Sequence, residues 1–236
     1  MPRMDILNAL ERADFDTPPE FTSVERKVHF TFPLIILKRA EQFRTPTNQV
    51  CFLLASGYFR AAKQFYAPKT FRPRDIEYVG RTLGHDPQYV QPHAYDKQTT
   101  LRHQQWILDA YGFQPFGPKA ERFLCREVDD MVRSQLKPKL IFYRAIDLLI
   151  REKTAVPGYY RLSQLILRSL NAHKKRLIEI VEKHLSRADR TLLDSLLEKP
   201  SDDDTSLGHR YRLTLLKKCS QSTRPAKIRE TIADFE

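Results

Sequence analysis

Apolar residues recur at spacings of three and four along most of this chain, and no segment alternates regularly between apolar and polar positions. The first pattern predicts amphipathic α-helices, whereas a strand would show the second. The 15 prolines against seven glycines predict helices separated by stiff turns. We therefore predict an all-α fold. The expected helices cover residues 5–13, 33–43, 45–61, 73–83, 86–90, 98–111, 119–135, 140–150, 160–185 and 187–199.

The helix expected at residues 160–185 has two unlike sides. At about 100° per residue, its apolar side should pack against the preceding helix. The polar side carries arginine and lysine, which reach phosphates, interleaved with glutamine and asparagine, which read base edges. A solvated face is the alternative, but such a face would more often carry glutamate. The apolar side consists of Leu162, Ile166, Leu170, Leu177 and Val181, and the polar side of Arg161, Gln164, Arg168, Asn171 and Lys175.

Three short helices with tight turns are expected between residues 73 and 111. The first ends at Gly84, a frequent residue after a helix, and the second starts at Asp86-Pro87. The third, residues 98–111, is polar at its start, as in a helix-turn-helix unit whose last helix meets DNA. A three-helix core without a role in DNA binding would show the same spacing, so both interpretations stay open.

Gly117-Pro118 has the composition of a hinge, and we expect a helical DNA-binding lobe on each side of it. The first lobe covers residues 1–117 and the second covers residues 118–200. Residues 201–236 begin with an acidic linker and should hold the start of a further helical segment.

The formal net charge is +11 and the pI is about 9.6, a balance that favours an anionic partner such as nucleic acid. No apolar run approaches the roughly 18 residues of a membrane helix, so we expect no membrane partner. Three distant cysteines predict reduced thiols, and hence a cytoplasmic protein.

Two short segments directly before expected helices carry donors that could hold phosphates at a helix N-terminus. Arg72 and Arg74 flank the start of one helix, and Tyr159 and Tyr160 precede another. The two tyrosine rings could equally pack the turn that they occupy.

Residues suited to catalysis or metal binding are not grouped in this sequence. The acidic clusters, Asp129-Asp130 and Asp202-Asp203-Asp204, lie on an amphipathic helix and in a polar linker, where solvated carboxylates are the better interpretation. No pair of cysteine or histidine residues has zinc-site spacing, and no glycine-rich phosphate loop is present. We therefore expect no catalytic residue, no metal site and no cofactor in this chain.

Several short motifs follow one another between residues 48 and 116. They are Asn48-Gln49-Val50-Cys51, Thr82-Leu83-Gly84, Thr99-Thr100-Leu101-Arg102-His103, and an aromatic segment from Tyr111 to Phe116. Their order and spacing resemble the N-terminal region of the Tn-three family of transposases, which are class II, replicative enzymes. The resemblance continues through Pro157-Gly158 and residues 212–217. Gln49, Cys51 and Thr100 differ from the Arg, Gly and Arg of the family pattern.

The resemblance implies that these helical domains bind the terminal inverted repeats of a transposon with sequence specificity. It also implies a bacterial, DNA-associated protein. In that family, catalysis and its divalent metal belong to an RNase-H-like domain further along. A chain that ends at Glu236 would then be a fragment that is inactive alone, although the full-length protein could be a dimer. The alternative function is a basic helical scaffold module that docks an acidic protein. Candidate DNA-binding residues are Arg72, Arg74, Lys97, Thr99, Thr100, Arg102, His103, Tyr159, Tyr160, Arg161, Gln164, Arg168, Asn171 and Lys175.

Overall fold

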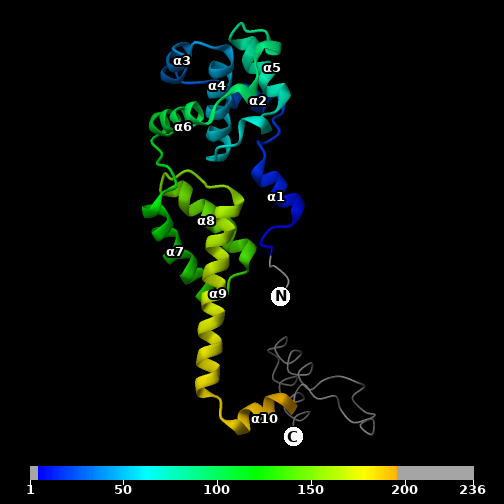
Figure 1. The fold of residues 1–236 in the computed structure, drawn as a ribbon, viewed down its shortest axis with the longest axis vertical. Coiled ribbons are helices and arrows are strands. Elements are labelled where there is room, and N and C mark those ends of the chain that lie inside the picture. Colours follow the sequence, from blue (N-terminus) through cyan, green and yellow to red (C-terminus); the bar gives the residue numbers. More distant parts are fainter. Residues whose placement is uncertain (1–4, 196–236) are drawn as a thin grey trace, which may run out of the picture. The chain divides into compact units, whose positions relative to one another are not determined.

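A computed structural model describes residues 5–195, and these residues form α-helices and 3-10 turns without a β-strand (Figure 1). The prediction of an all-α fold is confirmed for this range. The predicted segment 201–236 and the end of the helix expected at 187–199 lie outside the described residues. The helices are α1 (Ala9–Asp16), α2 (Ser23–His29), α3 (Leu34–Glu41), α4 (Pro46–Ala62), α5 (Pro73–Thr82), α6 (Lys97–Tyr111), α7 (Pro118–Arg133), α8 (Pro138–Arg151), α9 (Tyr159–His184) and α10 (Arg187–Ser195).

Local signals in the sequence set where the helices begin. The Thr45 side chain accepts a hydrogen bond from Asn48 N at the start of α4, and Asp96 caps α6 in the same way. Proline occupies the first turn of α4, α5, α7 and α8, where its missing N–H has no intrahelical partner to lose. α2, which apolar spacing did not predict, begins with a reciprocal capping box between Thr22 and Glu25.

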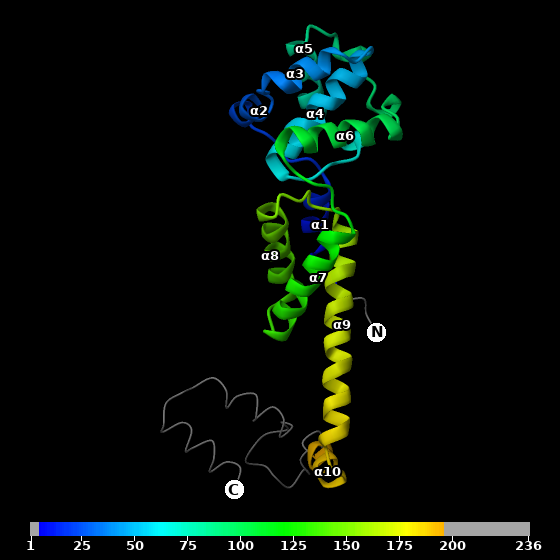
Figure 2. The ribbon, with the colours of Figure 1, turned by 90° about the vertical axis from the view of Figure 1, so that its left-hand side faces the viewer.

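The first hydrophobic core surrounds α4, which lies among α2, α3, α5 and α6 (Figure 2). Tyr58 of α4 donates a hydrogen bond to the buried Asp75 carboxylate at 2.7 Å, which ties α4 to α5. Gly57 lets the Phe30 ring lie directly on the α4 backbone, because a Cβ there would come within 2.3 Å of the ring. The buried apolar residues of α4 are Val50, Cys51, Phe52, Leu53, Leu54, Tyr58 and Phe59.

The second core is formed by α7, α8 and the first part of α9, together with the N-terminal segment of the chain. Ile6 and Leu7 are buried in it, and Leu7 N donates to the Tyr159 hydroxyl at 3.4 Å. Asp16, at the end of α1, accepts a hydrogen bond from Tyr159 N at 3.2 Å. The N-terminal segment therefore belongs to the second core, although the predicted first lobe, residues 1–117, includes it.

A short set of backbone hydrogen bonds joins the parts of the chain that build the two cores. Val156 N donates to Lys63 O at 2.9 Å, and Gln114 N donates to Lys153 O at 2.8 Å. Ala155 N donates to Gln114 O at 2.9 Å, and isolated bridges accompany these bonds. We call residues 153–156, with the facing Lys63, Gln64 and Gln114, the seam.

One compact unit extends to Lys174 and contains both cores, and a second unit begins at Lys175 within α9. In the second unit, the Ser186 hydroxyl and backbone pair with Asp189 at the start of α10. Leu177 and Val181 were predicted to pack, but they are 47% and 50% exposed. The packed side of α9 ends near Leu170, because the second core extends no further along this helix.

The predicted three-helix unit between residues 73 and 111 is built differently from a helix-turn-helix. α5 and α6 form as expected, but the middle member is a single 3-10 turn, Pro87–Tyr89, and a second turn, Pro92–Ala94, follows it. α6 packs against α3 and α4. The unit therefore lacks the middle helix of a helix-turn-helix, and the inner side of α6 is used for packing. None of the helices within residues 5–195 is long and apolar enough to cross a membrane.

Candidate nucleic-acid interface

α6 is fixed on the first core by the side that carries Thr99 and His103. These residues are 8% and 3% exposed. The His103 ring stacks on Phe43 with ring centroids 4.0 Å apart, and its Nδ1 lies 2.5 Å from the Tyr95 hydroxyl. Burial lowers the pKa of His103 to about 4, so the ring is neutral at physiological pH. Both residues were expected to contact DNA. The structure instead places their side chains inside the protein, where they hold α6 in position.

The outer side of α6 combines amide and guanidinium groups with one large apolar side chain. Gln98, Arg102 and Gln105 are exposed, and Leu101 is 57% exposed beside them. Arg102 donates to Thr99 Oγ1 at 3.2 Å, and Gln105 donates to Asp109 at 2.8 Å. Residues three and four apart share one side of a helix. We call the surface formed by Gln98, Leu101, Arg102 and Gln105 the α6 face.

Of the residues that the sequence singled out on α6, Lys97 and Arg102 reach solvent. Thr100 is half-buried, and its hydroxyl donates to Asp96 O at 2.8 Å. Gln98, Leu101 and Gln105 were not predicted as candidates. The signal was present, because Ile107 lies four residues after His103 and both belong to the apolar side of this helix.

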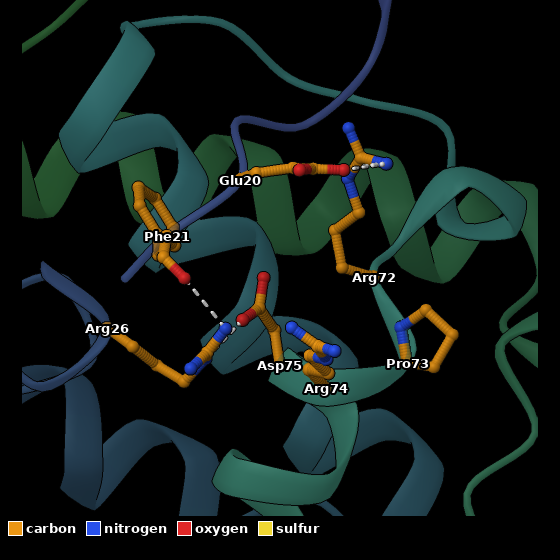
Figure 3. A pocket seen from close by; sticks show the side chains of 7 residues that line it. All are labelled: Glu20, Phe21, Arg26, Arg72, Pro73, Arg74 and Asp75. Atoms are coloured by element: carbon orange, nitrogen blue, oxygen red, sulfur yellow. Dashed lines mark hydrogen bonds and ion pairs between the residues drawn. The ribbon is translucent and has the colours of Figure 1, made fainter. Parts of the chain in front are cut away.

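A hollow of about 460 Å³ lies at the N-terminus of α5, between this helix and the segment that precedes α2 (Figure 3). Arg26 Nε donates to Asp75 Oδ1 at 2.6 Å, and its guanidinium also donates to Phe21 O at 2.9 Å. Arg72 donates to Pro18 O at 3.1 Å and pairs with Glu20 at 3.1 Å. These contacts already engage two of the three arginines that line the hollow.

Arg74 is the arginine of this hollow that remains available for a ligand. It is exposed, and no carboxylate within residues 5–195 forms an ion pair with it. Of the two phosphate contacts predicted before α5, Arg74 can therefore reach an incoming phosphate, while Arg72 is held by the protein.

The two predicted tyrosines, at the start of α9, differ in their exposure to solvent. Tyr159 is 5% exposed, and its ring lies 5.6 Å from the Phe142 ring in the second core. Tyr160 is 65% exposed. The alternative interpretation, in which a ring packs the turn, describes Tyr159, and only Tyr160 offers its hydroxyl to solvent.

α7 supplies the acidic partners that the polar side of α9 lacks in its own sequence. Arg161 pairs with Glu121 at 2.9 Å, and its guanidinium lies 4.8 Å from the centroid of the Phe116 ring. Ser169 donates a hydrogen bond to Asp129. The N-terminal part of this polar side is therefore partly occupied in holding α9 against α7.

The remaining residues on the predicted polar side of α9 differ in exposure. Gln164 is half-buried, and Arg168 and Asn171 are exposed. Among the described residues no carboxylate forms an ion pair with Arg168. Lys175, in the second unit, pairs with Glu179 at 3.8 Å. Arg168 is thus the cation on this polar side that is most available to a phosphate or a base.

A family model described as a domain of unknown function, DUF4158, matches residues 6–169. The chain belongs to this family. No curated protein sequence matches the chain. The DUF4158 region includes both cores, the seam, the hollow and the α6 face, and it ends at Ser169. Asn171 and Lys175 lie beyond its end.

In the described part of this DUF4158 chain, no three histidine, cysteine, aspartate or glutamate side chains gather in a way that could hold a metal ion. Asp129 accepts the hydrogen bond from Ser169, and Asp130 pairs with Arg133 at 3.5 Å. Both carboxylates of the first acidic cluster thus have partners within the protein. The second cluster, Asp202-Asp203-Asp204, lies outside the described residues.

Proposed function

We propose that this DUF4158 chain is the DNA-recognition part of a replicative transposase of the Tn-three family and binds transposon terminal inverted repeats. The ordered motifs between Asn48 and Phe116, which resemble that family, support this proposal. The net charge of +11 supports an anionic partner. Strand cleavage and its divalent metal would belong to a separate catalytic domain of the transposase.

The α6 face is the observation that carries the proposal, because it offers the chemistry that reads base edges. Glutamine can bond the adenine edge in two places, arginine can do the same for guanine, and an apolar side chain packs on the thymine methyl group. Gln98, Leu101 and Arg102 lie within about one turn, and Gln105 extends the face by another turn.

A base-reading helix must present its side chains in one fixed orientation. The buried side of α6 meets this requirement, since the His103 ring stacks on Phe43 and the Asp96 side chain caps the first turn. The exposed Leu101 adds an apolar side chain to this face, which can pack on a thymine methyl group.

Selection of duplexes from a random-sequence pool by the full 236-residue chain tests this proposal directly. We expect one sequence to be enriched and bound at least about 10³-fold more tightly than random DNA. Gln98→Ala and Gln105→Ala should each lose about 1–3 kcal/mol of discrimination, confined to one or two base pairs. Gln91→Ala is the matched control, because this exposed glutamine lies outside α6, and it should keep the wild-type preference.

The outcome also separates the proposal from the acidic-protein module that the sequence left open. Recognition of inverted repeats would be contradicted if the chain enriches no sequence and if random DNA competes completely for its binding. Enrichment that survives in both α6 variants would keep DNA recognition and move the base contacts to another surface, with Arg168 on α9 as the next candidate.

A further inference from the structure

Two lysines meet at the seam in the same unusual backbone conformation. Lys63 follows α4 with φ 56°, and Lys153 follows α8 with φ 50°. Glycine adopts this left-handed region without strain, whereas a residue with a Cβ does not. Both lysines also contribute backbone carbonyls to the seam, since Lys63 O accepts from Val156 N and Lys153 O accepts from Gln114 N. Their backbone positions are thus fixed by the contact between the two cores.

The side chains of these lysines converge on one aromatic ring. The Lys153 ammonium lies 5.1 Å from the centroid of the Phe113 ring, and the Lys63 ammonium lies 5.9 Å from it. Arg60, one turn before Lys63, donates from its guanidinium to Thr31 O at 2.5 Å. Within residues 5–195 none of these three cations forms an ion pair with a carboxylate. We call Arg60, Lys63 and Lys153 the seam cations.

The electrostatics around the seam cations are those of an unmatched positive cluster. Burial lowers the pKa of Lys63, and the charges of Lys153 and Arg60 lower it further. His29 of α2 faces the same cluster: burial lowers the pKa of its ring, and so do the charges of Arg60 and Lys63. Its Nδ1 is buried without a hydrogen-bond partner. Glu25 is the acidic group near His29, but it is engaged in the capping box of α2.

A purely structural role explains only part of this arrangement. A lysine near a helix C-terminus commonly bonds the last carbonyls, and Lys63 Nζ does donate to Arg60 O at 2.6 Å. Lys153 has no such bond among the described residues, and its charge raises the repulsion on Lys63. Residues kept in strained backbone conformations often mark functional sites. Here two strained positions place like charges together, which an anion would relieve.

We propose that Arg60, Lys63 and Lys153 bind a backbone phosphate of duplex DNA. This inference rests on the proposed function and adds to it a contact that carries no sequence information. A phosphate oxygen can accept hydrogen bonds from ammonium and guanidinium groups together, and it replaces mutual repulsion by attraction. Because the seam cations lie where the two cores meet, the phosphate would set the position of the duplex on the compact unit as a whole.

Glycine substitutions separate the charge of the lysines from any role in the fold. Lys63→Gly and Lys153→Gly remove the cation and also relieve the backbone strain, so the midpoint of thermal unfolding should stay the same or rise. Gln135→Gly is the matched control, because Gln135 has the same conformation, φ 56°, after α7 but carries no charge. It should raise the midpoint in the same way without an effect on DNA binding. Lys153→Arg keeps the charge and should bind DNA as the wild type does.

The binding measurement is a salt titration of the full chain on the selected duplex and on random duplex. Each glycine variant should lower the slope of log affinity against log salt by about one and weaken both duplexes alike, by up to about eightfold near 0.1 M salt. Unchanged slopes in both variants would overturn the proposal. So would a fall in the unfolding midpoint that Gln135→Gly does not share, because the lysines would then act as structural caps.

Calorimetric titration with inorganic phosphate distinguishes a DNA contact from a site for a free anion. If both glycine variants abolish phosphate binding but leave the DNA slopes unchanged, the site takes a free anion and the DNA contact is overturned. Failure of the wild type to enrich any sequence would contradict the proposed function alone, since a slope measured on random duplex still decides whether the seam cations contact DNA.

Discussion

The His103 ring is held on several sides: it stacks on Phe43, lies near Trp106 and bonds the Tyr95 hydroxyl. Protonation would place a second cation beside Arg102, whose charge also lowers the pKa of His103 after the main effect of burial, while Asp96 acts weakly in the opposite direction. Protonation of His103 should therefore weaken the packing of α6 on the first core and lower the stability of the fold.

We predict that His103 makes the chain less stable as the pH falls from about 6.5 towards 4. Its pKa is near the ordinary 6.5 in the unfolded chain and about 4 in the folded one, so the unfolded state binds more protons in this window. The contribution is fully present above pH 6.5 and amounts to at most about 3 kcal/mol. Urea unfolding at about pH 7.5 and pH 4.5 measures it.

The controls for this experiment replace an exposed histidine in one variant and the buried His103 itself in another. His93 is exposed, so His93→Gln should lose as much stability at low pH as the wild type. His103→Gln should be less stable at neutral pH but should change less between the two pH values. Equal pH dependence in His103→Gln and the wild type would show that other groups cause the effect.

Single residues were the hardest to assign from the sequence, and Arg161 shows the physical reason. Its own helix offers no glutamate beside it, which suggested a free cation, but Glu121 lies 40 positions earlier and reaches it from α7. Such a partner depends on how two helices pack, which the pattern of one helix does not contain. Thr99 and His103 are different, because their spacing with Ile107 already indicated the inner side of α6.

At the scale of elements, caps and prolines predicted most helix boundaries well. The helix expected at 98–111 is Lys97–Tyr111, and the one expected at 45–61 is Pro46–Ala62, with Thr45 as its N-cap. α2 escaped prediction because its valines, Val24 and Val28, are 74% and 53% exposed and form no buried stripe. The seam could not be predicted, since its backbone bonds join segments far apart in the sequence.

Among the described glycines, Gly57 is the one where an added Cβ would lie nearest to a neighbouring side chain, and it gives a test of the first core. A Cβ at Gly57 would lie 2.3 Å from the Phe30 ring, so Gly57→Ala should force this ring out of place and cost about 1–3 kcal/mol. Gly80, also buried in a helix, is the matched control. A Cβ there would meet its nearest atom at 3.6 Å, which is ordinary contact.

The two glycine variants should not change stability in the same direction. Gly80→Ala should leave stability unchanged or raise it by up to about 1 kcal/mol, because alanine favours a helix over glycine. Chemical denaturation of both variants measures the comparison. If Gly57→Ala is as stable as Gly80→Ala, then Phe30 can move at little cost and the packing of α2 on α4 is looser than the structure indicates.

At the scale of the whole molecule, two apolar cores meet at the seam within one compact unit. Gly117-Pro118, the expected hinge, lies between α6 and α7, but the N-terminal segment crosses back to the second core through Ile6 and Leu7. The sequence could not show this crossing, because a single buried turn before α1 has no periodicity of its own. Any separate expression of residues 118–200 would leave that core without these two side chains.

A substitution at Leu7 tests whether the two cores unfold together or one at a time. It is 3% exposed in the second core, so Leu7→Ala should cost about 2–5 kcal/mol there. Because the seam joins the two cores mainly by backbone hydrogen bonds, with Ala155 and Val156 as its buried apolar side chains, we expect the second core to open without the first. Hydrogen exchange should therefore speed up in α7, α8 and the first part of α9, while α4 keeps its protection.

Leu10→Ala, at a position 72% exposed, is the control and should change neither region. Equal loss of protection in α4 would show instead that the seam couples the two cores into a single cooperative unit, and a phosphate bound by the seam cations would then stabilise both cores together.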